Sequence, residues 1–201
     1  MDMPQWKKQQ QEMDPVWKKH MDSVLFTFKQ IHFALGQTNF PDFIKIGLKP
    51  LQVRCWDNLL QKRDVMAVLP TGYGKSLVFQ LLPHVMPLKD SRNFVLVIAP
   101  LSSIIQDQVS SLPSKKITPV VFKSEYFTEK IESLYHQDII DQEDALTELT
   151  DQHLTDGQFD LLFAHPEAML SEDGRNLMKT HLMKKNVVAI VIDEAHCVAT
   201  W

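Results

Sequence analysis

A short loop in the first half of the chain has the residue types that bind the phosphates of a nucleotide. Residues 70–76 read PTGYGKS and separate an apolar run, residues 65–69, from a stretch with apolar side chains at helical positions. Gly72 and Gly74 can take positive φ values and let backbone N–H groups converge on an anion. A helix that begins near Lys75 would turn its positive end toward that anion. We therefore expect a strand, a phosphate-binding loop and a helix in this order.

Two side chains of this loop would supply its chemistry. Lys75 can reach the β- and γ-phosphates of a nucleoside triphosphate, and the hydroxyl of Ser76 can bind Mg²⁺. One position departs from the usual pattern, because Leu69 stands where a glycine commonly opens the loop. The alternative interpretation is an ordinary turn followed by a helix cap, since short motifs of this kind also occur by chance.

An acidic pair follows the last apolar run of the chain. Residues 187–192 are apolar, and residues 193–196 read DEAH. A carboxylate at the end of a buried strand is costly unless a cation or hydrogen bonds compensate it, and Mg²⁺ held by Asp193 would do so. Glu194 could then orient and deprotonate an attacking water, while Lys75 and the metal neutralise charge on the γ-phosphate. A helix N-cap followed by an acidic first turn is the alternative.

The secondary-structure elements that must position these residues can be predicted from the pattern of apolar and polar stretches along the chain. Short apolar runs occupy residues 65–69, 94–99, 120–122, 159–164 and 187–192. Such runs are typical of strands buried on both faces, and the intervening lengths suit crossover helices, so we expect an α/β fold with a parallel sheet. Residues 24–35 have apolar positions at helical spacing, which predicts a helical extension over residues 1–40 before a domain over residues 41–201.

The composition is that of an ordinary globular protein. Of 201 residues 44% are hydrophobic and 23% charged, which excludes collagen and low-complexity disorder. The net charge of −4 is unevenly distributed, because residues 124–158 are strongly acidic and the rest of the chain is mildly basic. We interpret the acidic segment as a solvated face of a helix. Cys55 and Cys197 lie too far apart in the sequence to match a zinc or redox motif, so we expect both to be reduced thiols. With no signal peptide or membrane span, we expect an intracellular soluble protein, nuclear in a eukaryote.

Taken together, the motifs make the chain similar to the first RecA-like lobe of a superfamily 2 helicase of the RecQ family, over residues 43–201. RecQ proteins resemble it in the PTGxGKS loop with a bulky residue such as Leu69 before it and Gln80 and Pro83 after it. They also share a stretch like PLSSIIQDQV at residues 100–109, a Pro-Glu pair after a strand, and DEAHC followed by a tryptophan, here Trp201. RNA helicases with a GETGSGKT loop are a weaker match.

The resemblance implies an ATP site in a RecA-like P-loop lobe. In the family, a segment similar to residues 48–52 reads adenine, and Gln52 stands at the amide that pairs with the base edge. The resemblance implies that Lys75, Asp193, Glu194 and His196 are catalytic and that Ser76 and Asp193 hold Mg²⁺. The residues implied in ATP binding are Lys49, Gln52, Thr71, Gly72, Tyr73, Gly74, Lys75 and Ser76. His196 would tie the nucleotide state to the lobe interface. Because Lys45 and Lys49 replace a usual aromatic residue and a usual arginine, we expect weakened adenine selectivity.

The resemblance also implies a path for a DNA strand. Loops at the carboxyl ends of parallel strands face one crevice. The residues implied in backbone contacts are Pro100, Leu101, Ser102, Ser103, Gln106, His165, Pro166 and Glu167. Such contacts grip a strand without reading its sequence. His165 stands where relatives have a small residue, and ordinary strand-to-helix turns are the alternative for both segments.

Parts of the family's helicase core have no counterpart in these 201 residues. Relatives continue with a second RecA-like lobe, and one further strand inserts between the strands that carry Lys75 and Asp193. We therefore expect an incomplete sheet, a lobe truncated after the DEAH residues and an inactive fragment of a longer 3′-to-5′ DNA helicase. The alternatives are a P-loop ATPase or RNA translocase without unwinding, and a non-catalytic fragment that binds nucleotide, DNA or a partner.

Overall fold

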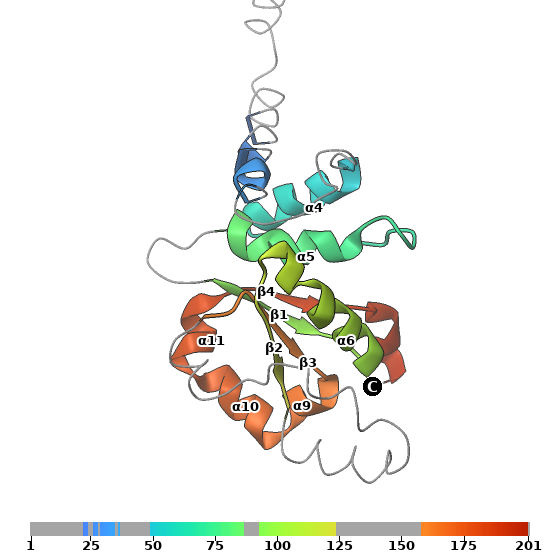
Figure 1. Ribbon diagram of the computed structural model, residues 1–201, viewed down its shortest axis with the longest axis vertical. Coiled ribbons are helices and arrows are strands. Elements are labelled where there is room, and N and C mark those ends of the chain that lie inside the picture. The colour runs from blue at the N-terminus through green and yellow to red at the C-terminus, as the bar shows by residue number, and fades with distance from the viewer. Residues whose placement is uncertain are drawn as a thin grey trace, which may run out of the picture.

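The computed structural model describes residues 49–86, 93–123 and 158–200, together with positions 22–23, 26–27, 29–34 and 36. Strands β1 (Phe94–Ile98), β2 (Pro119–Phe122), β3 (Leu161–Ala164) and β4 (Val187–Ile192) form one parallel sheet in the order β2-β3-β1-β4. The helices are α4 (Pro50–Leu60), α5 (Lys75–Val85), α6 (Ser102–Ser111), α9 (Pro166–Leu170), α10 (Glu172–Lys179) and α11 (His181–Asn186), with 3₁₀ turns η1 (Pro113–Lys115) and η3 (Ala195–Thr200). The expected α/β fold, a parallel sheet flanked by helices, is confirmed (Figure 1).

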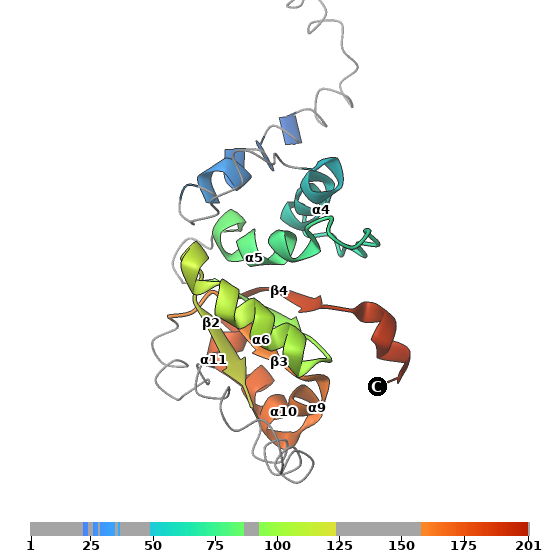
Figure 2. The ribbon, with the colours of Figure 1, turned by 45° about the vertical axis from the view of Figure 1, so that its right-hand side comes forward.

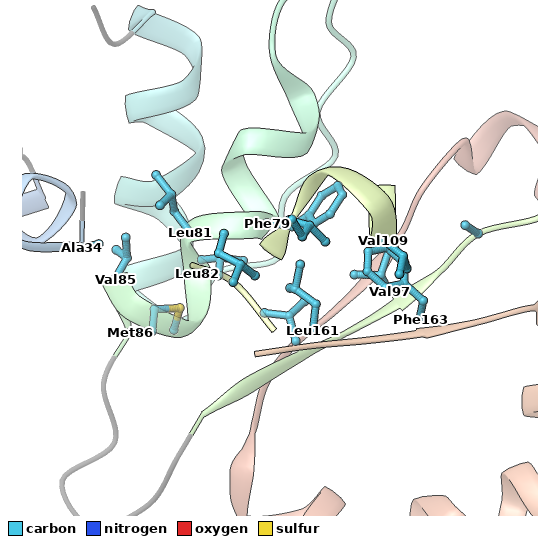
Figure 3. Close-up of a cluster of buried hydrophobic side chains, with 14 of the residues drawn as sticks. Ala34, Phe79, Leu81, Leu82, Val85, Met86, Val97, Val109, Leu161 and Phe163 are labelled. Atoms are coloured by element: carbon cyan, nitrogen blue, oxygen red, sulfur yellow. The ribbon is translucent and has the colours of Figure 1, made fainter. Parts of the chain in front are cut away.

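Helices cover both faces of the sheet, which explains why its strands read as continuous apolar runs. Along β1, Val95 and Val97 join a buried cluster with residues of α5 and α6, whereas Phe94 and Leu96 join a second cluster with residues of α10 and α11. This alternation follows the two-residue repeat of a strand. Figures 1 and 2 show α4 and α5 on the opposite side of the sheet from α10 and α11, and Figure 3 shows the first cluster.

The described positions between residues 22 and 36 are helical and pack against the rest of the fold. Ile31 and Ala34 are fully buried in the cluster that contains α5. Asp57 of α4 accepts hydrogen bonds from Ser23 Oγ at 2.7 Å and Thr27 Oγ1 at 3.1 Å. The expected helix is present at these positions, and the boundary at residue 41 stays a prediction.

The prediction of a strand before the glycine loop, at residues 65–69, is wrong. Residues 65–69 have no strand conformation, and Met66 and Val68 are 86% and 87% exposed. A strand forms only where a neighbouring strand takes up its N–H and C=O groups, and among the described residues none pairs with this segment. The outer edge of β4 is likewise unpaired there, with Ile190 and Ile192 about half exposed. Among the described residues the sheet therefore ends at β4, and the missing strand that the resemblance implied stays a prediction.

The cysteines, the acidic segment and the hydropathy of the helices were also subjects of prediction. Cys55 and Cys197 are free thiols, as predicted. Lys45 and residues 124–157 of the acidic segment lie outside the described residues. Within the described residues, no helix combines the length and hydropathy needed to cross a bilayer.

Candidate active site

The phosphate-binding loop ends in a helix cap made by a left-handed glycine. Gly74 is the N-cap of α5 with φ +88°, and Gly72 has φ +74°. Lys75 is the first residue of the helix, and its Nζ donates to the Leu69 carbonyl at 3.4 Å. The loop thus directs a lysine and the amino end of a helix to the same place, which is the arrangement that binds a phosphate.

The start of α4 is bonded to this loop through two side chains. Gln52, which is buried, accepts from Lys49 N at 3.0 Å and donates from Nε2 to the carbonyls of Tyr73 and Gly74 at 3.2 and 3.0 Å. Lys49 Nζ donates to the Gly72 carbonyl at 3.1 Å and lies 4.7 Å from the centroid of the Tyr73 ring. The two side chains implied in adenine binding therefore lie against the phosphate-binding loop.

The acidic pair lies at the carboxyl end of β4. Asp193 N donates to the Ile98 carbonyl of β1 at 2.9 Å, which continues the sheet register by one residue. Burial raises the pKa of the Asp193 carboxyl and the Glu194 charge adds to this, while the Glu194 N–H and the Lys75 charge lower it. The charge of Lys75 acts on Asp193, and residues of α5 and β4 pack in one buried cluster, so the two motif-bearing segments belong to neighbouring elements.

Glu194 has an unusual backbone and a bonded side chain. Its φ is +51°, a left-handed conformation that costs a residue with a Cβ free energy. Its Oε2 lies 3.2 Å from Nδ1 of His196, whose side chain is 76% exposed. Two candidate catalytic residues thus contact each other, with the histidine reaching into solvent.

Ser76 and Asp193 have the donor chemistry that fits a nucleotide-bound Mg²⁺. Ser76 and Asp193 are half-buried and carry a hydroxyl and a carboxylate, the hard oxygen ligands that Mg²⁺ prefers. The cost of burying the Asp193 charge, seen in its raised pKa, is what a cation would relieve. No cluster of three His, Cys, Asp or Glu residues occurs in the described parts of the chain, and Mg²⁺ completed by phosphate oxygens and water does not need one.

The two segments implied in DNA binding follow neighbouring strands and contact each other. Ser102 Oγ lies 3.3 Å from Nε2 of His165, and the His165 ring also bonds the backbone of Pro100. Burial lowers the pKa of His165, whereas the Glu167 charge and the Pro100 contact raise it. His165 therefore joins the loop after β1 to the loop after β3.

The remaining residues of these segments differ in exposure. Leu101, Ser102, Ser103 and Glu167 are exposed, as is Thr71 of the phosphate-binding loop; Pro100 and Gln106 are half-buried and Pro166 is buried. The exposed members surround the first turns of α6 and α9, where backbone N–H groups are free to meet an anion. Their contact with DNA stays a prediction.

A polar chain of four side chains was missed by sequence reasoning. Gln108 of α6 donates from Nε2 to Ser76 Oγ at 3.0 Å, Gln80 donates to Gln108 Oε1, and Lys115 Nζ donates to Gln80 Oε1 at 3.5 Å. These residues border a cavity of about 320 Å³. The available signal was a glutamine three residues after the buried Ile105, on the core-facing side of a helix.

The fold and this site define a class. A parallel α/β lobe with a glycine loop capping one helix, and an acidic pair at the carboxyl end of a strand of the same sheet, is the nucleotide-binding unit of a P-loop nucleoside triphosphatase. Residues 49–201 match the family model described as DEAD/DEAH box helicase, and the chain belongs to this family.

Relatives within this family are RecQ-type helicases, which confirms the resemblance. The chain is 32% identical to the ATP-dependent helicase SGS1 of Saccharomyces cerevisiae over 77% of the chain and 10% of that protein. It is 32% identical to the ATP-dependent DNA helicase RecQ of Synechocystis over 72% of the chain and 26% of that protein. It is 31% identical to the ATP-dependent DNA helicase hus2/rqh1 of Schizosaccharomyces pombe over 77% of the chain and 11% of that protein. The chain thus spans about a quarter or less of these relatives.

Proposed function

We propose that the chain is the ATP-binding lobe of a RecQ-type DNA helicase that moves 3′ to 5′ along one strand. The observation that carries this proposal is that α5, which the glycine loop caps, packs against β4, the strand that ends directly before Asp193. A loop lysine and a strand-end carboxylate on two packed elements can serve the same triphosphate. The family match and the names of the relatives support DNA and ATP as the ligands.

In this proposal the chain's own residues divide the work between binding and chemistry. The loop N–H groups and Lys75 hold the β- and γ-phosphates and neutralise charge that develops on the γ-phosphate. Glu194 orients the attacking water and accepts its proton, and His196 adjusts that carboxylate through their contact. Mg²⁺, held by Ser76 and Asp193, would add positive charge against the phosphate oxygens.

Strand movement is proposed to follow from a second lobe that closes over the nucleotide. The exposed Ser102 and Ser103 at the start of α6 and Glu167 at the start of α9 would lie along the DNA backbone. Hydroxyl and N–H groups there grip phosphates without selecting a sequence. In a longer chain, opening and closing of the two lobes would shift this grip by steps along the strand.

ATP hydrolysis by a longer chain that includes the second lobe, measured with single-stranded DNA or RNA, tests the proposal. DNA should stimulate turnover more than RNA does, and an RNA preference would favour the RNA translocase instead. Lys75→Ala should abolish turnover, and Glu194→Gln should keep ATP binding while losing turnover. Lys179→Ala, an exposed lysine on α10, is the matched control. Turnover that survives in Lys75→Ala contradicts the assignment of the site.

One observation favours a second candidate, a non-catalytic lobe that binds nucleotide or DNA. The segment before the glycine loop, residues 65–69, is exposed and lacks a neighbouring strand among the described residues. A loop without that support on one side holds its catalytic groups less rigidly. Nucleotide binding without hydrolysis by a longer chain that includes the second lobe would favour this candidate, and hydrolysis by that chain would exclude it.

A further inference from the structure

A continuous path of side-chain hydrogen bonds connects the phosphate-binding helix α5 with helix α6. It runs from Ser76 through Gln108 and Gln80 to Lys115. Gln80 is buried, and the amides of both glutamines are bonded through their nitrogen and through their oxygen. We infer that Gln108 is a positioning residue that orients the Ser76 hydroxyl toward a nucleotide-bound metal and couples it to α6.

The direction of every bond in this path is determined by its last member. A lysine ammonium can only donate, so Gln80 must present its oxygen to Lys115 and its nitrogen to Gln108. Gln108 must then present its oxygen to Gln80 and its nitrogen to Ser76. The Ser76 oxygen is therefore an acceptor toward Gln108.

This polarity leaves the Ser76 hydroxyl in the state that a metal site needs. A serine hydroxyl has one proton and two acceptor lone pairs. With Gln108 on one lone pair, the second lone pair is available to a cation and the proton to a phosphate oxygen. A partner that accepted from Ser76 would instead take the proton away from the nucleotide. Groups that orient a metal ligand in this way commonly change metal affinity when they are removed.

The same bond makes α6 sensitive to the nucleotide. Gln108 lies on the helix whose first turn contains Ser102 and Ser103, the hydroxyls proposed to meet DNA. A hydrogen bond weakens steeply when its atoms separate beyond their normal distance, so a small shift of α6 would release Ser76. Binding of DNA at the start of α6 is thereby linked to binding of a metal at Ser76. This inference rests on the proposed function, because it assumes that Ser76 binds the nucleotide's metal.

The test measures binding of a fluorescent ATP analogue as Mg²⁺ is titrated, with EDTA as the metal-free reference. Gln108→Met keeps the length of the side chain and removes the hydrogen bond. It should raise the Mg²⁺ concentration for half-maximal binding about 10-fold while affinity in EDTA stays unchanged. Ser76→Ala should raise it at least as much, and the double variant no further than Ser76→Ala, because both changes remove one interaction.

A matched control and a second variant separate the possible outcomes. Gln61 also donates to a serine hydroxyl, Ser23 Oγ at 3.1 Å, but it caps the end of α4 opposite to Gln52, so Gln61→Met should leave the titration unchanged. Lys115→Met, at the other end of the path, should shift the Mg²⁺ titration in the same direction as Gln108→Met. It replaces Gln108→Met in the test if Gln108→Met does not fold.

Three results would count against the inference or the proposed function. An unchanged Mg²⁺ titration in Gln108→Met, with a shifted one in Ser76→Ala, overturns the inference and leaves the proposed function standing. Equal loss of affinity with and without Mg²⁺ in Gln108→Met marks a structural role and also overturns it. An unchanged titration in Ser76→Ala contradicts the metal assignment of the proposed function itself.

Discussion

The side-chain amide of Gln52 donates to the Gly74 carbonyl at 3.0 Å, so the residue implied in adenine binding is bonded to the N-cap of the phosphate-binding helix. A second bond reaches the Tyr73 carbonyl. The two ends of a nucleotide would therefore meet one connected unit rather than two separate elements. A change in the loop should then alter the recognition of the base.

Alanine substitutions of the two loop glycines test this connection. Both residues have positive φ, so either alanine costs about 1–2 kcal/mol of backbone strain. Only at Gly74 would the new Cβ lie 2.6 Å from Gln52 Nε2, whereas nothing lies within 4 Å of a Cβ at Gly72. Gly74→Ala should lower the ratio of ATP to GTP affinity, and Gly72→Ala should leave that ratio near the wild-type value. Nucleotide titrations measure both, and equal ratios in the two variants contradict the connection.

Asp193→Asn should make the fold more stable at neutral pH. Burial raises the pKa of this carboxyl above 3.8, so the folded state holds the proton more tightly than the unfolded chain does. The favourable contribution of the protonated acid is complete below pH 3.8 and is lost as pH rises through the folded pKa. An amide has no charge to bury, so the variant should unfold at a higher temperature at pH 7 and lose this advantage in acid.

Unfolding midpoints at pH 7 and pH 4 measure this difference. Asp64→Asn, an exposed acid before the glycine loop, is the control and should not gain stability. A lower midpoint for Asp193→Asn at pH 7 would show that its hydrogen bonds outweigh the cost of burial.

Local patterns predicted the four strands but failed for a fifth run of the same kind. β1 is apolar because both of its faces pack against other elements, whereas β4 is equally apolar although Ile190 and Ile192 are about half exposed. Residues 65–69 are equally apolar, yet they form no strand because strand formation depends on a neighbour that local sequence does not describe.

The same distinction applies to the site. Gly72, Gly74 and Lys75 were predicted because loop geometry depends on consecutive residues. The bond from Gln108 to Ser76 joins residues 32 positions apart, and its direction is set by Lys115 on a third element. No spacing rule along the chain contains that information.

Below pH 6.5, His165 should reduce the stability of the fold. Burial lowers its pKa from 6.5, so the stabilising contribution of the neutral ring is complete above pH 6.5 and is lost as pH falls through the folded pKa. Since proline has no N–H, the neutral ring donates to the Pro100 carbonyl and can accept from Ser102. His165→Gln keeps a donor and an acceptor and has no titrating group.

Urea unfolding between pH 8 and pH 5 checks this prediction. The wild-type chain should lose stability relative to His165→Gln as the solution becomes acidic. His181→Gln, an exposed histidine on α11, should follow the wild-type curve. A constant difference between wild type and His165→Gln across this range contradicts the prediction.

Thr27→Val should loosen the N-terminal helical segment from α4. Thr27 is 1% exposed, and its one hydroxyl proton is shared between Asp57 Oδ1 at 3.1 Å and the Ser23 carbonyl at 3.0 Å; Ser23 Oγ is the other donor to Asp57 Oδ1. Valine has the same shape without the hydroxyl, and loss of a hydrogen bond to a charged group costs about 1.5–3 kcal/mol. Denaturant unfolding should show this loss, with Thr118→Val, an exposed threonine, as the control. An unchanged free energy of unfolding would mean that Ser23 and the buried Ile31 and Ala34 hold the segment without this bond.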